Sequence, residues 1–151
     1  MIRKMENRDV EAVHQIEKEC FALPWSKQSL SKEVDNPQSL FYIYEENKKI
    51  LAYMGMYCIG YEGDITNVAV TAYERHKGIG RELLSKVLEE AETKGLTEFT
   101  LEVRESNKAA ISLYESLGFK TEGVRKNFYD NPKENGLIMW LSLIHISEPT
   151  R

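Results

Sequence analysis

Apolar residues recur along this chain with two different spacings, and each spacing predicts one kind of secondary structure. Alternating or continuously apolar runs are typical of strands, and apolar residues three or four apart are typical of helices. Strands are predicted at 2–5, 40–44, 50–59, 65–70, 97–104 and 137–141, with a short strand or loop at 119–124. Helices are predicted after the candidate N-caps Asn7, Ser26 and Asn107, and over 81–94.

The predicted elements follow one another in the order β-α-α-β-β-β-α-β-α-β-β. Short polar turns separate the three strands between residues 40 and 70, as in an antiparallel meander. Gly95 and Gly118 stand directly after the third and fourth helices, where glycine commonly ends a helix. Together these features predict one α+β (mixed α/β) domain built around a mostly central sheet.

The composition is that of a single soluble globular domain. The chain has 151 residues, of which 42% are apolar and 29% charged, and its formal net charge is −4. An acidic balance argues against a nucleic-acid-binding protein, since phosphate backbones attract basic surfaces. No apolar run approaches the roughly 18 residues of a membrane span, and the first residues do not resemble a signal peptide. We therefore expect a cytoplasmic protein, a monomer or weak dimer, without direct nucleic-acid or membrane binding.

The two cysteines do not suggest a metal or redox site. Cys20 and Cys58 lie far apart in the sequence and match no spacing of metal ligands or redox pairs. We expect two reduced, buried thiols and no bound metal.

One short segment carries the chemistry of an anion-binding loop. Residues 75–80, Arg-His-Lys-Gly-Ile-Gly, lie between the predicted strand at 65–70 and the helix at 81–94. Glycines just before a helix let the backbone approach a ligand closely. The free N–H groups and the dipole of the first helical turn then favour a phosphate. This segment therefore predicts a ligand that carries a pyrophosphate.

Two common phosphate-binding loops do not fit this segment. A nucleoside-triphosphate loop requires Gly-x-x-x-x-Gly-Lys-Ser/Thr, which the residues around Gly78 and Gly80 do not provide. A Rossmann dinucleotide loop requires Gly-x-Gly-x-x-Gly, but Leu83 occupies the position of the third glycine.

The segment resembles the R-x-x-G-x-G loop that binds the acetyl-CoA pyrophosphate in the GNAT superfamily of N-acetyltransferases. Residues 101–119 read L-E-V-R-x-S-N-x-x-A-I-x-L-Y-E-S-L-G-F, which is similar to the second signature block of that superfamily. Three segments resemble the ribosomal-protein-alanine N-acetyltransferases of the RimI type: this block, F-x-x-P-W-S at 21–26 and R-x-x-F-Y at 125–129. The resemblance covers roughly residues 2–141.

The resemblance implies a fold and an acetyl-CoA site. The implied fold is a central, mostly antiparallel, twisted sheet flanked by about four helices. Backbone groups of the strand before the loop would pair with the pantetheine arm like an added strand, and an N–H near Val70 would hold the thioester oxygen. The implied acetyl-CoA-binding residues are Val68, Ala69, Val70, Arg75, His76, Lys77, Gly78, Ile79, Gly80, Arg81 and Asn107.

The implied reaction is attack of an amine on a thioester, which needs a base and benefits from an acid. Glu102 is the candidate base, because it lies on the polar side of a strand whose other side is apolar. From the pattern alone it could equally be a surface carboxylate in a salt bridge. Tyr114 is the candidate acid for the departing thiolate, and its alternative is a core aromatic. Asn107 could contact acetyl-CoA, cap a helix, or do both.

In the RimI type the acceptor is the N-terminal α-amine, usually of alanine, of a small-subunit ribosomal protein. Trp25 and Tyr129 are the expected walls of the peptide groove, although Trp25 could instead anchor the core. The chain departs from the common spelling at Phe128, where tyrosine is frequent. A small-molecule amine as acceptor and a non-catalytic acyl-CoA-binding module remain alternative hypotheses.

The last residues differ from the rest of the chain. Residues 142–151, Ser-Leu-Ile-His-Ile-Ser-Glu-Pro-Thr-Arg, do not resemble a family C-terminus. We expect an N-acetyltransferase domain at 1–141 and a tail at 142–151 that is not native sequence.

Overall fold

The computed structural model describes residues 1–75 and 77–143. The predicted order of elements is confirmed, with two short 3-10 turns in addition at Asn7–Asp9 and Ala72–Glu74. The elements are β1 (Ile2–Lys4), α1 (Val10–Cys20), α2 (Lys27–Val34), β2 (Ser39–Glu46), β3 (Lys49–Ile59), β4 (Glu62–Val70), α3 (Ile79–Thr93), β5 (Glu98–Arg104), α4 (Lys108–Ser116), β6 (Lys120–Tyr129) and β7 (Glu134–Ser142).

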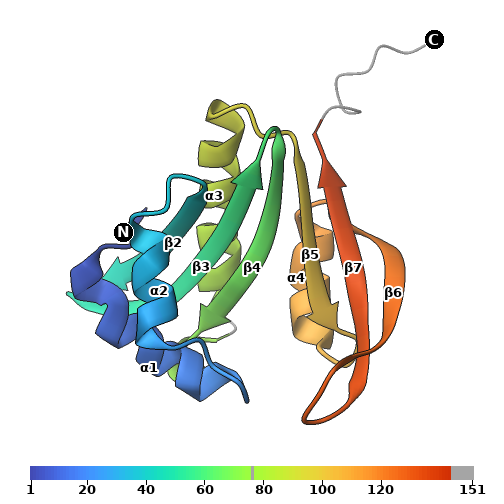
Figure 1. The fold of residues 1–151 in the computed structure, drawn as a ribbon, viewed down its shortest axis with the longest axis horizontal. Helices are drawn as coiled ribbons and strands as arrows, with labels where there is room; N and C mark the ends of the chain where they lie inside the picture. Colours follow the sequence, from blue (N-terminus) through green and yellow to red (C-terminus); the bar gives the residue numbers. More distant parts are fainter. Residues whose placement is uncertain (76, 144–151) are drawn as a thin grey trace.

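Seven strands form one sheet in the order β1-β2-β3-β4-β5-β7-β6 (Figure 1). Neighbouring strands are antiparallel except β4 and β5, which are parallel because α3 connects them across the sheet. Pairing between β4 and β5 covers only residues 62–65 and 98–101. Beyond these residues the two strands diverge, as the ribbon shows (Figure 1). The prediction of a mostly antiparallel sheet is therefore confirmed.

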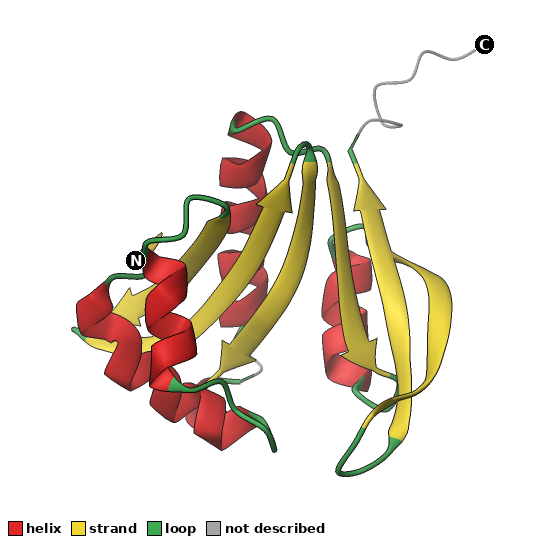
Figure 2. Cartoon of the chain, viewed as in Figure 1, coloured by secondary structure: helices red, strands yellow, loops and turns green. Residues whose placement is uncertain are grey.

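The helices cover both faces of the sheet (Figure 2). On one face α1 and α2 bury Val13, Ile16 and Leu30 against side chains of β2, β3 and β4. On the other face α3 buries five apolar side chains in a larger cluster, which also contains Tyr114 of α4. The five side chains are Ile79, Leu83, Leu84, Val87 and Ala91. The last four have the spacing of an apolar helical stripe.

Gly55 interrupts the apolar run of β3 for a packing reason. It pairs with Phe41 of β2, whose ring lies over the glycine. A Cβ at Gly55 would stand 2.3 Å from the ring, so a larger residue there would displace Phe41. Phe41 also packs near the Trp25 ring, so this glycine helps to place a residue of the predicted groove.

Some predicted boundaries are wrong. Asn7 does not cap a helix but lies in a 3-10 turn, where the Glu6 N–H donates to Asp9 Oδ2 at 2.8 Å, and α1 begins at Val10. The ambiguous segment at 119–124 belongs to the ten-residue strand β6. Most of β6 is exposed and its register against β7 is irregular, so it lacks the period-2 apolar pattern of a half-buried strand.

The C-terminal end of the described chain continues β7 through Ser142, the first residue of the predicted tail. Leu143 N–H donates to the Thr97 carbonyl at 2.8 Å. The rest of the tail, 144–151, lies outside the described residues, as does His76 of the predicted loop. In the described part of the chain, no helix has both the length and the apolar character needed to span a membrane.

Candidate active site

A pocket of about 580 Å³ lies where β4 and β5 diverge. Its lining comes from α1 and the α1–α2 loop, from β4 and β5, from α4 and its N-cap, and from the end of β6 with the β6–β7 loop. It brings together six residues singled out from the sequence: Trp25, Val68, Glu102, Asn107, Tyr114 and Tyr129. The parting of two strands thus gathers side chains that are more than 100 residues apart in the chain.

The β4 side of this pocket offers backbone groups. Val68 and Val70 pair with Met54 and Ala52 of β3 along one edge of β4. On its other edge the Val70 carbonyl accepts from Arg75 Nε at 3.1 Å and from Cys20 Sγ at 3.4 Å. Arg75 therefore turns back onto β4, so that its charge lies beside the end of this strand and not out over the loop.

The loop before α3 has the backbone geometry of an anion site. Gly78 adopts a left-handed φ of 82° at the N-cap, and its carbonyl accepts from Glu82 N–H at 3.0 Å. Among the described residues, the N–H groups of Ile79, Gly80 and Arg81 have no acceptor. Three such groups at a helix N-terminus can bind an anionic oxygen.

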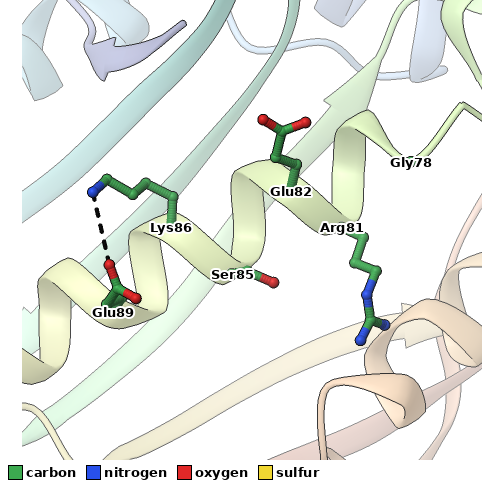
Figure 3. Close-up of a pocket in the computed structure, with 6 residues that line it drawn as sticks. All are labelled: Gly78, Arg81, Glu82, Ser85, Lys86 and Glu89. Atoms are coloured by element: carbon green, nitrogen blue, oxygen red, sulfur yellow. Dashed lines mark ion pairs between the residues drawn. The ribbon is translucent and has the colours of Figure 1, made fainter.

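Side chains at the start of α3 do not form a strongly basic patch. A hollow on this helix is lined by Gly78, Arg81, Glu82, Ser85, Lys86 and Glu89 (Figure 3). Its two acidic side chains balance its two basic ones, and Lys86 pairs with Glu89 at 3.7 Å. Lys77 pairs with Glu74 at 3.3 Å, and Arg81 donates to Ser116 Oγ of α4. The backbone amides are therefore the main anion-binding feature here.

Glu102 faces the pocket because β5 alternates. Its neighbours Leu101 and Val103 are buried on the other side of the strand. Glu102 Oε2 lies 2.6 Å from Arg125 Nε, so the ion pair considered from the sequence does exist. The geometry is not that of a hydrogen bond, and this buried oxygen receives none from the described residues. Glu102 therefore lines the pocket with one oxygen in an ion pair to Arg125.

Tyr114 is both a core aromatic and a pocket residue. Its side chain is 7% exposed, and its ring packs against Phe119 with centroids 5.9 Å apart. Burial, with a smaller contribution from Tyr129, raises the pKa of Tyr114 to about 12. Like any tyrosine it is protonated at neutral pH, and the shift moves its ionisation further into the alkaline range. Asn107 caps α4, accepting from Ala110 N–H at 3.2 Å, and lines the same pocket.

Trp25 reaches the pocket from the α1–α2 loop, and Tyr129 from the end of β6. The Trp25 ring packs 6.0 Å from the Phe41 ring, so this residue both anchors the core and lines the pocket. The Arg104 guanidinium lies 4.6 Å from the centre of the Tyr129 ring. Arg104 also donates to the Asp130 and Pro132 carbonyls at 2.8 Å, and thereby holds the β6–β7 loop.

Glu17 is a pocket residue that the sequence analysis did not single out. Its side chain is 1% exposed, and it accepts from Trp25 N–H, from the Tyr53 hydroxyl and from Asn67 Nδ2. A signal was present in the sequence, since this acid follows the same helical spacing as the buried residues Val13 and Ile16. An acid on the apolar face of a helix is seldom buried without a specific partner.

The cysteines are half-buried, and the prediction that they are buried is therefore wrong. Cys20 lies at the edge of the pocket, 3.1 Å from Arg75 Nη2. Burial raises the pKa of the Cys20 thiol, and the Arg75 charge only partly opposes this effect. Over residues 1–75 and 77–143, no three His, Cys, Asp or Glu side chains are grouped closely enough to hold a metal ion.

Comparison with known proteins points to one family. The model of the acetyltransferase (GNAT) family matches residues 10–119. A [ribosomal protein bS18]-alanine N-acetyltransferase of Escherichia coli (strain K12) is 34% identical over 144 residues, covering 94% of this chain and 97% of the relative.

Solved structures of N-acetyltransferases have a similar fold. The crystal structure of the Escherichia coli ribosomal-protein-S18-alanine N-acetyltransferase has a TM-score of 0.88 at 34% identity, covering 95% of this chain and 93% of that one. The paia N-acetyltransferase of Thermoplasma acidophilum, in complex with coenzyme A, has a TM-score of 0.80 at 21% identity, covering 94% and 98%. The second likeness concerns the fold alone.

The family match includes the Gly78 loop, β4, Glu102 and Tyr114, and it extends over more than half of the chain. The resemblance in the two sequence blocks and the expected fold are thereby confirmed. The chain belongs to the acetyltransferase (GNAT) family.

Proposed function

We propose that this chain transfers an acetyl group from acetyl-CoA to the N-terminal α-amine, usually of alanine, of a small-subunit ribosomal protein. The observation that carries the proposal is the pocket between β4 and β5, lined by the edge of β4, a carboxylate and a protonated phenol. Further support comes from the E. coli relative named for this activity, which is similar over 94% of the chain. Such a substrate implies action in the cytoplasm, and we propose a monomer or weak dimer without bound metal or nucleic acid.

Acetyl-CoA is proposed to bind along β4 and the start of α3. The backbone of Val68, Ala69 and Val70 offers hydrogen bonds to the amides of the pantetheine arm. The amides of residues 78–81, with the charge of Lys77 and Arg81, receive the pyrophosphate. Arg75 and Asn107 complete the proposed set, and His76 belongs to it from the sequence alone.

Glu102 is proposed to remove a proton from the acceptor ammonium, directly or through a water. An α-ammonium, with a pKa of about 7.7–8.0, gives up this proton far more readily than a lysine near 10.4. The amine lone pair then forms a bond to the thioester carbonyl carbon, and the oxyanion is held by a backbone N–H near Val70.

Tyr114 is proposed to complete the reaction. When the oxyanion collapses, the carbon–sulfur bond breaks and its electron pair leaves with the sulfur. The Tyr114 hydroxyl gives its proton to that thiolate, and the attacking nitrogen releases its second proton, which returns to the Tyr114 phenolate through solvent. Glu102 gives the first proton to solvent, and the products are the N-acetyl peptide and CoA. At neutral pH this phenol carries its proton, so the hydroxyl is available to donate.

The test is incubation of the protein with acetyl-CoA and peptides that begin with alanine, followed by mass spectrometry. We expect one acetyl group per peptide, located on the α-amine, and release of CoA. Peptides with a blocked N-terminus and internal lysines are the control and should remain unmodified. Acetylation of small amines in place of peptides would favour the small-molecule alternative. Acetyl-CoA binding without turnover of any amine would favour the non-catalytic module.

A further inference from the structure

We propose that Glu17 is a positioning residue, whose buried carboxylate fixes the Trp25 wall of the acceptor groove to the strand that binds acetyl-CoA. The assignment of Trp25 to the groove rests on the proposed function, but the contacts of Glu17 do not. Glu17 is 1% exposed and lies on α1 beneath the α1–α2 loop, with Tyr53 on β3 and Asn67 on β4 as partners.

The two oxygens of Glu17 have different partners. Oε1 accepts from the Trp25 backbone N–H at 2.7 Å. Oε2 accepts from the Tyr53 hydroxyl and from Asn67 Nδ2, which lies 3.4 Å away. Asn67 Nδ2 also donates to the Tyr53 oxygen at 3.0 Å, which closes a buried triangle. The carboxylate therefore joins an irregular loop on one side to two central strands on the other.

A carboxylate suits this place because both sides present donors. Glu17 makes no ion pair among the described residues, so hydrogen bonds to its charged form must offset the cost of burial. An amide side chain has only one acceptor oxygen, so it would turn its NH₂ group toward a donor on one side. Contact with this cluster also raises the pKa of the Tyr53 phenol, mainly through burial and then through the Glu17 charge. Tyr53 therefore remains a donor.

The fixed point in the loop is Trp25. Its N–H is held by Glu17, and its carbonyl lies 3.0 Å from His14 Nδ1, so two residues of α1 hold the backbone of one loop residue. The residues just before it are open to solvent, with Leu23 76% exposed. On the far side of Glu17, Asn67 directly precedes Val68 of the acetyl-CoA strand. Through these hydrogen bonds Glu17 fixes the position of Trp25, the proposed groove wall, relative to β4.

The test combines kinetics with hydrogen exchange in Glu17→Ala and Glu17→Gln. A lost hydrogen bond to a charged group is worth about 1.5–3 kcal/mol, which is about a tenfold or greater change. We expect Glu17→Ala to raise the peptide KM about tenfold or more while the acetyl-CoA KM changes less than about twofold. Glu17→Gln should change the peptide KM in the same direction by about threefold, since one acceptor remains.

Exchange at the Trp25 amide, measured by NMR without substrates, tests the contact itself. We expect it to be slow in the wild type and at least about tenfold faster in Glu17→Ala. Glu11→Gln is the matched control, since Glu11 lies on the same helix but is exposed, and its contacts are a surface ion pair with Lys27 and a hydrogen bond from Gln15 at 3.3 Å. This variant should leave both KM values and the Trp25 exchange rate unchanged.

Unchanged Trp25 exchange would overturn the proposal, as would equal changes in the two KM values. If Glu17→Ala does not fold, the same two measurements on Glu17→Gln test the proposal. If the wild type acetylates no peptide, the proposed function fails, while exchange at Trp25 still decides whether Glu17 holds the loop.

Discussion

The two sides of the cleft are built from different parts of the polypeptide. The β4 side, from Val68 to the amides before Glu82, presents mostly backbone groups. The β5 side presents side chains: Glu102, Tyr114 and Tyr129. Binding through backbone groups tolerates many side chains but depends on the conformation of the chain. Binding or catalysis through side chains depends on which residues are present. Substitutions on the two sides should therefore behave differently.

Glu102→Gln should have the largest effect. The amide keeps the shape of the side chain but cannot take a proton at neutral pH, so kcat/KM should fall about 100- to 10,000-fold. Steady-state assays with an alanine-terminated peptide measure this. Acetyl-CoA affinity, measured by calorimetry, is the control and should stay within about twofold, because Glu102 lies on the other side of the cleft. Unchanged turnover would remove Glu102 from the role of base.

Tyr114→Phe should reduce kcat about 100-fold by removing the proton donor. The fold should be preserved, because the Tyr114 hydroxyl makes no hydrogen bond among the described residues and the ring contact with Phe119 is retained. Thermal unfolding is the control for stability. A variant that is equally active would show that solvent protonates the thiolate.

Alkaline pH should test the burial of the same phenol. The folded-state pKa of Tyr114 is raised to about 12, above an unfolded value of about 10. Its stabilising contribution is therefore complete below pH about 10 and is lost as pH rises toward 12, at about 1.4 kcal/mol per pH unit. Urea unfolding between pH 8 and 11 should show a smaller decline for Tyr114→Phe than for the wild type. Parallel curves would contradict this.

Gly78→Ala should weaken acetyl-CoA binding about tenfold. The left-handed φ of 82° costs an L-residue about 1–2 kcal/mol, and relief of that strain would reorient the helix amides. Gly80→Ala is the matched control, because a Cβ there would meet Leu113 and Val70 at 3.5 and 3.6 Å, which is ordinary contact. Its affinity should change less than about threefold. Equal losses in both variants would argue against a conformational role for Gly78.

Val68→Ala should have the smallest effect. If the strand edge binds acetyl-CoA through its backbone, affinity should stay within about twofold. Calorimetry with acetyl-CoA measures this. A tenfold loss would show that the β4 side depends on side chains after all, and the contrast between the two sides would not hold.

The sequence predicted some parts of the cleft better than others. The Gly78 loop and the alternation around Glu102 are local patterns, and they were recognised together with the helices and central strands. The cleft itself was not predictable from local patterns, because it depends on β4 and β5 pairing only over residues 62–65 and 98–101. The Glu17–Tyr53–Asn67 triangle joins residues up to 50 positions apart, and no local spacing reveals it.

The irregular register of β6 also affects how the protein behaves in solution. As the last strand of the sheet, β6 presents a free row of backbone groups to which another chain could add a strand. Breaks in register after Thr121 and after Arg125 interrupt that row. The exposed charges of Lys120, Arg125 and Lys126 oppose the approach of a like edge. The irregular register that hid this strand from the sequence pattern therefore also opposes edge-to-edge pairing.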